Sequence, residues 1–313
     1  MKFNIITLGC KVNAYESEFM QEALLRSGYL YDEKNPDIII INTCSVTNMA
    51  DRKSRKLVHK ARREHKDALL VVVGCSAQNH QEDYQNMGID ILLGNREKSK
   101  IVSILEKYIR DHEPYTYFTK ERSLDFEDMQ VEEFTTHTRA FVKVQDGCDN
   151  FCSYCIIPYV RGSIRSKDFD KAIEEVKTLV SHGHKEVVLT GIHTGSYSSG
   201  GHDLSDLIEE MAKIDGLTRI RISSIEITEL NDKFLNLLKR EPKIANHLHI
   251  PLQSGSDAVL KRMNRKYDTN YFREKIAQIR AIRPDISITT DCIVGHPYET
   301  EECFLEYVAF CRD

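Results

Sequence analysis

Three cysteines lie within eight residues in the segment GCDNFCSYC, at Cys148, Cys152 and Cys155. Closely spaced thiolates bind metals, most often zinc or iron–sulfur clusters. A structural zinc site takes four protein ligands, usually from two CxxC-like pairs, and the sequence has no second pair nearby. The spacing therefore favours an iron–sulfur cluster, in which three cysteines leave one iron open for an exchangeable ligand. Zinc, or three packed cysteines without a metal, remain the alternatives.

A second set of cysteines is dispersed along the chain but shares one feature. Cys10, Cys44 and Cys75 each end an apolar run, in IITLGC, IIIINTC and LLVVVGC. In a parallel sheet the carboxyl ends of the strands lie along one edge, where open α/β folds bind ligands. We therefore expect the three thiols to converge and to form a second metal site. The alternative is that each cysteine is packed at a strand end by chance.

Short apolar runs alternate with helical patterns in the first hundred residues, and this arrangement would position the second set of cysteines. Runs of four to eight residues rich in Ile and Val predict strands, and apolar residues recurring every three or four positions predict helices. The alternation predicts a small parallel α/β sheet domain over residues 1–110. The predicted strands are FNIITLG, DIIIIN, ALLVVVG and DILLG.

The rest of the chain repeats this rhythm in longer units. Residues 111–138 are rich in acidic side chains and lack periodicity, so we expect a linker or extended crossover there. From residue 139 to 313 five predicted strands are each followed by a helix-length segment, which favours an α/β fold with a parallel sheet curling into a partial barrel. A closed (βα) barrel needs about eight such units. The strands are RAFVKVQDG, HKEVVLTG, TRIRISSIE, ANHLHIPLQ and DISITTDCIVG.

Composition limits the class of protein. The 313 residues carry a formal charge of −5, which excludes a wholly basic nucleic-acid coat but not a local basic patch. Every apolar run is shorter than the roughly 18 residues of a membrane span, and the first residues lack the features of a signal peptide. We therefore expect a cytoplasmic protein with reduced cysteines and no membrane partner.

The cysteine motifs resemble those of a known family. The CxxxCxxC loop is similar to that of the radical S-adenosylmethionine (radical SAM) superfamily, and the two cysteine sets in this order resemble the methylthiotransferases. The motif VKVQDGCDNFCSYCIIPYVRG carries the resemblance, and LTGIHTGSY, HIPLQSGSDAVLKRMNRKY and TTDCIVGHPYETEE extend it. TLGCKVNAYES and SSIE resemble the MtaB-type subgroup. The MiaB type, acting on isopentenyladenosine, and the RimO type, acting on a ribosomal-protein aspartate, are close alternatives.

The resemblance implies a radical SAM partial barrel and two [4Fe-4S] clusters with separate tasks. Cys148, Cys152 and Cys155 would hold the cluster that reductively cleaves S-adenosylmethionine, the radical source and methyl donor. Cys10, Cys44 and Cys75 would hold an auxiliary cluster that carries sulfur. The implied reaction adds a methylthio group to C2 of N6-threonylcarbamoyladenosine at position 37 of tRNA. The resemblance also implies an electron donor such as flavodoxin or ferredoxin, and the chain suggests a monomer.

We expect seven further residues to bind S-adenosylmethionine, some from the resemblance and some from their place at loop or strand ends. Tyr154 stands where the family places an aromatic ring against the adenine, and Gly191 would let the methionine amino group approach the backbone. The others lie at loop or strand ends, although Tyr154 could equally be a core residue and the polar ones surface residues. Near the adenine contacts, Cys292, His296 and Tyr298 depart from the family pattern. The remaining five are Arg161, Glu226, Gln253, Val294 and Gly295.

A basic amphipathic helix is predicted at residues 51–66, a few residues after Cys44. The segment carries eight Lys or Arg side chains, and such a face is usually simply solvated. Because phosphate neutralisation supplies most nonspecific affinity for nucleic acids, we expect tRNA contacts here, with Arg62 and Arg63 as candidates.

Two readings from other classes stay open. One is a noncatalytic iron–sulfur protein that binds tRNA, and the other is a protein with only packed cysteines. The sequence ends before the sixth barrel strand and the C-terminal TRAM domain of the family, so we expect an incomplete barrel. We assign no role to Cys292, Cys303 and Cys311, nor to His193, His249 and His296.

Overall fold

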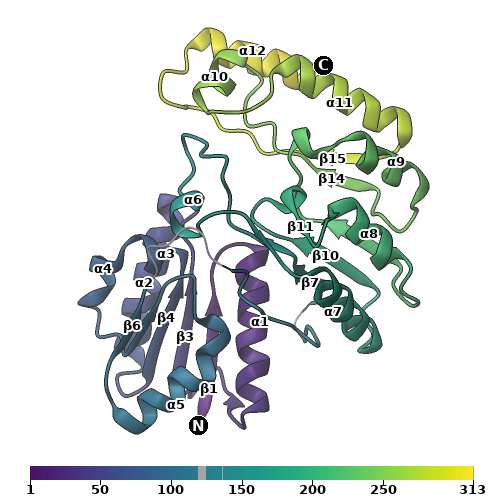
Figure 1. Cartoon of the computed structure of the whole chain (residues 1–313). Coiled ribbons are helices and arrows are strands. Elements are labelled where there is room, and N and C mark those ends of the chain that lie inside the picture. Colours follow the sequence, from purple (N-terminus) through teal and green to yellow (C-terminus); the bar gives the residue numbers. More distant parts are fainter. Residues whose placement is uncertain (119–124, 136, 313) are drawn as a thin grey trace. The chain divides into compact units, whose positions relative to one another are not determined.

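The computed structural model describes residues 1–118, 125–135 and 137–312, and the chain divides into two compact units (Figure 1). The N-terminal unit comprises Met1–Phe134 and Ile156–Ser163, and the C-terminal unit comprises Thr135–Cys155 and Ile164–Asp313. The short segment after Cys155 thus packs with the N-terminal unit, inside a range that we expected to belong to the barrel.

A six-stranded parallel sheet forms the N-terminal unit, in the order β2-β1-β3-β4-β5-β6. The four predicted strands are present. Every residue of β3 and β4 is buried, as expected for central parallel strands covered on both faces. The strands are β1 (Lys2–Thr7), β2 (Leu30–Tyr31), β3 (Ile38–Thr43), β4 (Leu69–Gly74), β5 (Ile91–Leu93) and β6 (Tyr115–Tyr117).

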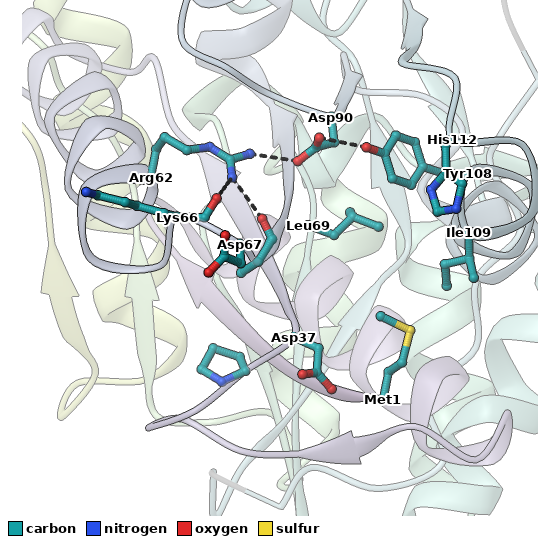
Figure 2. Close-up of a pocket in the computed structure, with 12 residues that line it drawn as sticks. Met1, Asp37, Arg62, Lys66, Asp67, Leu69, Asp90, Tyr108, Ile109 and His112 are labelled. Carbon is teal, nitrogen blue, oxygen red and sulfur yellow. Dashed lines mark hydrogen bonds and ion pairs between the residues drawn. The ribbon is translucent and has the colours of Figure 1, made fainter.

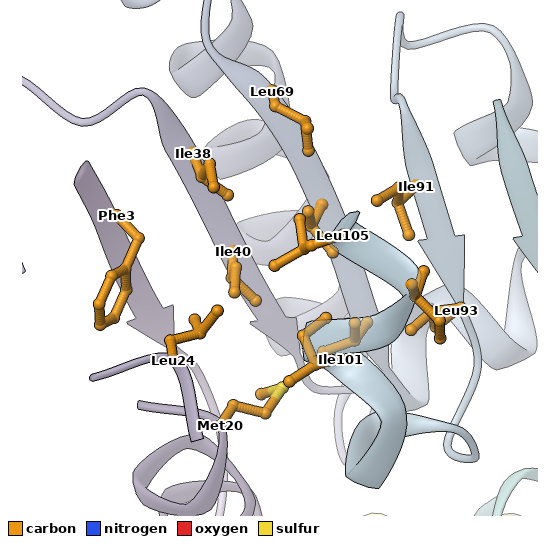
Figure 3. Packing of buried hydrophobic residues seen from close by; sticks show 13 residues of the cluster. Phe3, Met20, Leu24, Ile38, Ile40, Leu69, Ile91, Leu93, Ile101 and Leu105 are labelled. Atoms are coloured by element: carbon orange, nitrogen blue, oxygen red, sulfur yellow. The ribbon is translucent and has the colours of Figure 1, made fainter. Parts of the chain in front are cut away.

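Helices cover both faces of this sheet. Helices α1 (Lys11–Arg26) and α5 (Ile101–Asp111) pack on one face, where Met20, Leu24 and Leu105 meet the strands (Figure 3). On the other face Val58, Ala61 and Tyr84 complete the core. That face carries α2 (Asn48–Glu64), α3 (Cys75–Asn79) and α4 (Gln81–Gln85), while α6 (Ile157–Val160) and the 3₁₀ turn η1 (Lys98–Lys100) belong to the same unit.

Part of the expected linker is built into the N-terminal unit. Strand β6 lies within residues 111–138 and pairs with β5. Met129, Val131 and Phe134 are buried, and the Tyr15 hydroxyl donates a hydrogen bond to the Met129 carbonyl over 2.6 Å. The acidic residues around these positions obscured the apolar side chains that attach the segment.

Parallel strands followed by helices form the C-terminal unit, which confirms the predicted α/β fold with a partial barrel. The strands pair in the order β13-β10-β7, and β14 pairs with β15. A bridge between Ile220 and Ile244 links β13 to the chain before β14. The five strands are β7 (Ala140–Lys143), β10 (Glu186–Thr190), β13 (Arg219–Ile222), β14 (His247–His249) and β15 (Ser287–Thr289).

Side-chain caps explain where the crossover helices begin. Asp168, Asp203, Asn231 and Asp268 each accept a hydrogen bond from a backbone N–H of the helix that they precede. These helices are α7 (Phe169–Ser181), α8 (Leu204–Ala212), α9 (Asp232–Arg240) and α11 (Thr269–Ile282). The other elements are α10 (Asp257–Arg262), α12 (Glu301–Arg312), turns η2 (Thr194–Ser196) and η3 (Ile227–Glu229), and pairs β8 (Gln145–Asp146) with β9 (Arg165–Ser166) and β11 (Ser198–Ser199) with β12 (His202–Asp203). Within the described ranges, no helix is long and apolar enough to span a membrane.

Candidate iron–sulfur and cofactor sites

The turns that carry Cys10, Cys44 and Cys75 meet at the carboxyl edge of the N-terminal sheet. They follow β1, β3 and β4, which are neighbours in the sheet. Gly9, at φ +107°, passes so close to the next turn that a Cβ there would lie 2.8 Å from the Cys44 sulfur. Cys44 and Cys75 are buried and Cys10 is exposed. Strand ends therefore bring together the three cysteines that the sequence grouped.

Hydrogen bonds fix the Cys44 turn. Its backbone N–H donates to Ser54 Oγ over 3.2 Å, and the same hydroxyl donates to the Cys44 carbonyl over 3.1 Å. Burial, with smaller contributions from the neighbouring Cys75 and Cys10 thiols, raises the pKa of the Cys44 thiol. The site is thus a compact group of thiols with one exposed member.

Cys148, Cys152 and Cys155 lie on one loop of the C-terminal unit, just after β8. The Cys155 N–H donates to the Cys152 carbonyl over 2.9 Å, which folds the end of the loop into a tight turn. The Asn264 side chain donates to the carbonyls of Asn150 and Phe151, over 3.0 and 3.1 Å. A second segment thus supports the cysteine loop.

Arg265 contacts a loop thiol directly, and the sequence analysis did not single it out. Its guanidinium donates to Cys152 Sγ over 3.3 Å and forms an ion pair with Glu226. Tyr267 lies under the guanidinium, with its ring centre 5.0 Å from the central carbon. Although burial lowers the pKa of Arg265, the nearby Glu226 carboxylate raises it. Glu226, expected to bind the cofactor, thus anchors a cation beside the cysteine loop.

His193 is a second residue that sequence reasoning missed. Its Nδ1 lies 4.0 Å from Cys148 Sγ, and its Nε2 lies 2.6 Å from Glu229 Oε1. Burial lowers the pKa of His193, but hydrogen bonds to Cys148 and Glu229 outweigh it and raise the pKa to about 10. An imidazolium therefore faces Cys148 at neutral pH. The signal available in the sequence was its place two residues after the strand-end motif LTG.

Two of the expected cofactor-binding residues, Gly191 and Gln253, lie where the backbone is closely constrained. A Cβ on Gly191 would lie 2.9 Å from Gln145 Oε1, and that oxygen accepts the His193 N–H over 2.7 Å. Gln253 has a left-handed backbone, at φ +65°, and its carbonyl accepts the Ile293 N–H over 2.8 Å. The need for glycine at 191 thus already follows from its packing against Gln145.

The segment with Val294 and Gly295, where we expect adenine contacts, is connected to the cysteine loop by His296. This histidine is one of the residues that depart from the family pattern. Val294 is exposed, and Gly295 adopts φ +80°. The next residue, His296, has its Nε2 3.1 Å from Ser153 Oγ, in the cysteine loop. Tyr154, on the same loop, has 38% of its surface exposed and is available for stacking.

Arg161 lies elsewhere than expected. It belongs to the N-terminal unit, where its guanidinium donates to Glu16 Oε1 over 3.0 Å and to Asn13 Oδ1 over 2.9 Å. The side chain is completely buried. Sequence position alone, six residues after Cys155, suggested the cofactor face of the barrel.

The prediction that Arg62 contacts tRNA is wrong, because its guanidinium is bonded within the protein. Its guanidinium donates to the carbonyls of Lys66, Ala68 and Gly88, over 2.6–3.0 Å. It also donates to Asp90 over 2.7 Å (Figure 2). These bonds hold it at a 640 Å³ pocket by the amino ends of the strands, at the sheet edge opposite the cysteines. Arg62 is therefore a structural residue. The neighbouring Arg63 has 73% of its side chain exposed, and its Nη2 lies 3.8 Å from Glu64 Oε1.

Both thiol groups suit thiolate-bound clusters. The loop thiols have cationic hydrogen-bond donors beside them, Arg265 and His193, as expected where thiolates carry negative charge. Cys75 Sγ lies 3.5 Å from Asn95 Nδ2. Among the described residues, no group of three or more His, Cys, Asp or Glu side chains is arranged to hold a metal ion, so the fit to a cluster rests on the residue types and their neighbouring donors and not on a preformed ion site.

Comparison with protein families matches both units. The Radical SAM superfamily model matches residues 142–311, and a model described as Uncharacterized protein family UPF0004 matches residues 2–94. Among solved structures, the cobalamin-dependent S-adenosylmethionine radical enzyme OxsB has a TM-score of 0.68 at 12% identity, over 99% of this chain and 51% of that one. The radical S-adenosylmethionine methyltransferase TsrM from Kitasatospora setae has a TM-score of 0.69 at 14% identity, covering 99% and 71%. These likenesses show the fold.

Curated relatives are more similar in sequence. Threonylcarbamoyladenosine tRNA methylthiotransferase MtaB of Bacillus subtilis is 41% identical over 98% of this chain and 70% of the relative. The Thermotoga maritima protein of the same name is 40% identical, over 98% and 72%. A tRNA-2-methylthio-N(6)-dimethylallyladenosine synthase of Carboxydothermus hydrogenoformans is 35% identical, over 99% and 73%. The resemblance drawn from the motifs is confirmed: the chain belongs to the radical S-adenosylmethionine methylthiotransferases, an enzyme family, and to their MtaB type.

Proposed function

We propose that this enzyme adds a methylthio group to C2 of N6-threonylcarbamoyladenosine at position 37 of tRNA. The observation that carries the proposal is the presence of two separate thiol triads, one at the strand ends of the N-terminal sheet and one on a loop of the C-terminal unit. Relatives at 41% and 40% identity that are named for this tRNA nucleoside support the substrate. A carbon without a leaving group or an acidic proton resists acid–base chemistry, so cofactors must supply the difficult step.

The reaction would use two [4Fe-4S] clusters and S-adenosylmethionine, and a separate set of cysteines would hold each cluster. Cys148, Cys152 and Cys155 would hold one cluster, and Cys10, Cys44 and Cys75 the other. When bound, these groups supply the electron that cleaves S-adenosylmethionine and the sulfur that is inserted at C2. The chain itself orients the cofactor and the nucleoside, which is where a protein contributes most in such chemistry.

Residues around the cysteine loop would position S-adenosylmethionine. Tyr154 offers an exposed ring for the adenine, and Val294 and Gly295 lie in a segment that His296 connects to the same loop. Glu226 and Gln253 supply polar groups, with Glu226 already oriented by Arg265. Gly191 keeps the backbone accessible at the end of β10.

Transfer RNA would contact the exposed basic side chains of α2. Because Arg62 donates to protein acceptors, the candidates are Arg63 and the exposed Arg52 and Lys53, in the second turn of the helix. The helix starts four residues after Cys44. Phosphate contacts of this kind orient a nucleic acid without reading its sequence. We further propose a cytoplasmic monomer that receives electrons from a donor such as flavodoxin or ferredoxin.

Iron analysis tests the two-cluster arrangement. Two variants are compared with wild type after anaerobic reconstitution: the loop-triple variant (Cys148→Ala, Cys152→Ala, Cys155→Ala) and the strand-triple variant (Cys10→Ala, Cys44→Ala, Cys75→Ala). We expect about eight irons in the wild type and about four in each variant, because each triad holds its own cluster. Unchanged iron in the strand-triple variant would refute sulfur insertion by a second cluster.

A second substrate is supported by the 35% identity to the dimethylallyladenosine synthase. The two candidates are separated by incubating the reconstituted enzyme with S-adenosylmethionine and tRNA carrying one nucleoside or the other. Mass spectrometry of the digested tRNA then detects the methylthio product. We expect product from threonylcarbamoyladenosine, and product from isopentenyladenosine alone would reverse the assignment.

A further inference from the structure

Three charged side chains are buried together beside the auxiliary cysteines. Glu16 of α1 forms ion pairs with Lys98 of η1 and with Arg161, which follows α6. The side chains of Lys98 and Arg161 are fully buried, and that of Glu16 is 1% exposed. We call these residues the N-terminal trio. It carries two positive charges and one negative charge.

Two asparagines connect the N-terminal trio to all three cysteine turns. Asn13 accepts from Arg161 and donates to the carbonyls of Leu8 and Thr43, over 2.7 and 2.9 Å. These carbonyls lie directly before the turns that carry Cys10 and Cys44. Asn95 accepts from Lys98 over 3.5 Å and lies 3.5 Å from Cys75 Sγ through its Nδ2. A single connected network therefore supports the whole triad.

Burial of such a trio is costly and contributes little net stability, because desolvation offsets the attraction between the charges. The C-terminal unit shows the contrast. Lys167, directly after β9, and Glu175 of α7 form a fully buried ion pair there. In the N-terminal trio, by contrast, the hydrogen bonds lead through Asn13 and Asn95 to a thiol and two cysteine turns.

We propose that the N-terminal trio, acting through Asn13 and Asn95, positions the auxiliary cysteines and sets the reduction potential of the cluster that they hold. This inference rests on the second cluster of the proposed function. A buried cation near a cluster stabilises its reduced, more negative state, and a buried carboxylate does the opposite. Lys98 and Glu16 therefore act on the potential in opposite directions, which a purely structural role would not produce.

The test uses the loop-triple variant, so that only the auxiliary cluster contributes to the signal. Lys98→Met and Glu16→Gln are introduced separately, with Lys167→Met as the matched buried-lysine control. Each protein is reconstituted, checked by circular dichroism and iron analysis, and titrated electrochemically. We expect Lys98→Met to shift the midpoint potential to a more negative value, Glu16→Gln to a more positive value, and Lys167→Met to leave it unchanged.

The possible outcomes separate a failure of this inference from a failure of the second cluster on which it rests. Loss of iron from Lys98→Met but not from an equally folded Lys167→Met would support the positioning role. Equal loss from both would overturn it, as would intact iron with unchanged potentials. No iron in the loop-triple background itself would overturn the second cluster, and the inference with it.

Discussion

Both thiol triads lie next to a buried group of two cations and one carboxylate, but the groups contact the thiols differently. In the C-terminal unit, Lys143 and Arg165 both pair with Asp146 over 2.9 Å, two residues before Cys148. Asp146 also accepts the Gly147 N–H over 2.8 Å. This group therefore fixes the backbone of the cysteine loop, whereas the N-terminal trio reaches a thiol through a neutral amide.

Charged donors to thiols are found in the C-terminal unit. Arg265 and His193 face Cys152 and Cys148, and each is anchored by its own carboxylate. In the N-terminal unit Asn95 contacts Cys75, and Cys10 is exposed. The cysteine loop thus has fixed cations beside its thiols, which would suit the electron transfer to S-adenosylmethionine that we propose for it. The edge of the N-terminal sheet has an exposed cysteine, which would suit the proposed transfer of sulfur.

The largest expected effect comes from breaking the Arg265 contact. Arg265→Ala removes the donor to Cys152 and leaves Glu226 without its cation. Since loss of such supporting contacts costs about 10–100-fold, we expect 5′-deoxyadenosine formation to fall by about 100-fold. The measurement is chromatography after anaerobic reduction with S-adenosylmethionine. Lys261→Ala, an exposed position nearby, is the control, and wild-type rates in Arg265→Ala would contradict the role.

Replacing His193 should have a smaller effect, because its 4.0 Å separation from Cys148 Sγ is longer than that of Arg265 from Cys152. For His193→Gln we expect about a 10-fold loss of 5′-deoxyadenosine formation.

The pH dependence sharpens this prediction. The pKa of His193 is raised to about 10, so its protonation stabilises the folded apo-protein fully below the unfolded pKa of about 6.5. That contribution is lost as the pH rises towards 10. Urea unfolding should therefore show the greatest difference between wild type and His193→Gln at pH 6 and a shrinking one above pH 7. A difference that is constant with pH would refute the charged state.

Neighbouring arginines on α2 should separate stability from tRNA binding. Arg62→Ala removes a guanidinium that donates to four acceptors and should lower the free energy of unfolding by about 1–3 kcal/mol. Arg63→Ala should change stability by less than about 0.5 kcal/mol. We expect Arg63→Ala to weaken tRNA binding modestly and to reduce its salt dependence by about one phosphate contact. Urea unfolding and filter binding at two salt concentrations measure the two effects, and equal losses of stability would contradict the distinction.

Sequence reasoning located both triads because strand ends and a CxxxCxxC loop are local patterns. It predicted the strands for the same reason, since period and length are readable along the chain. It misplaced Arg161 and Arg62 because an arginine's partners are set by tertiary contacts. The start of helix α1 at Lys11 is hard to read from the sequence for the same reason, because Asn13 and Glu16 are buried for polar contacts and interrupt the apolar periodicity.

The smallest effect concerns the reactivity of the auxiliary thiols in the apo-protein. Cys10 is exposed, whereas Cys44 is 4% exposed and has a raised pKa caused first by burial. Because the thiolate is the reactive form, iodoacetamide should modify Cys10 faster at pH 8, and the gap should narrow as the pH rises and Cys44 ionises. Peptide mass spectrometry over time measures both rates in the loop-triple variant. Equal rates at pH 8 would mean that Cys44 is not buried in the apo-protein. The three cysteine turns would then be organised only when the cluster binds.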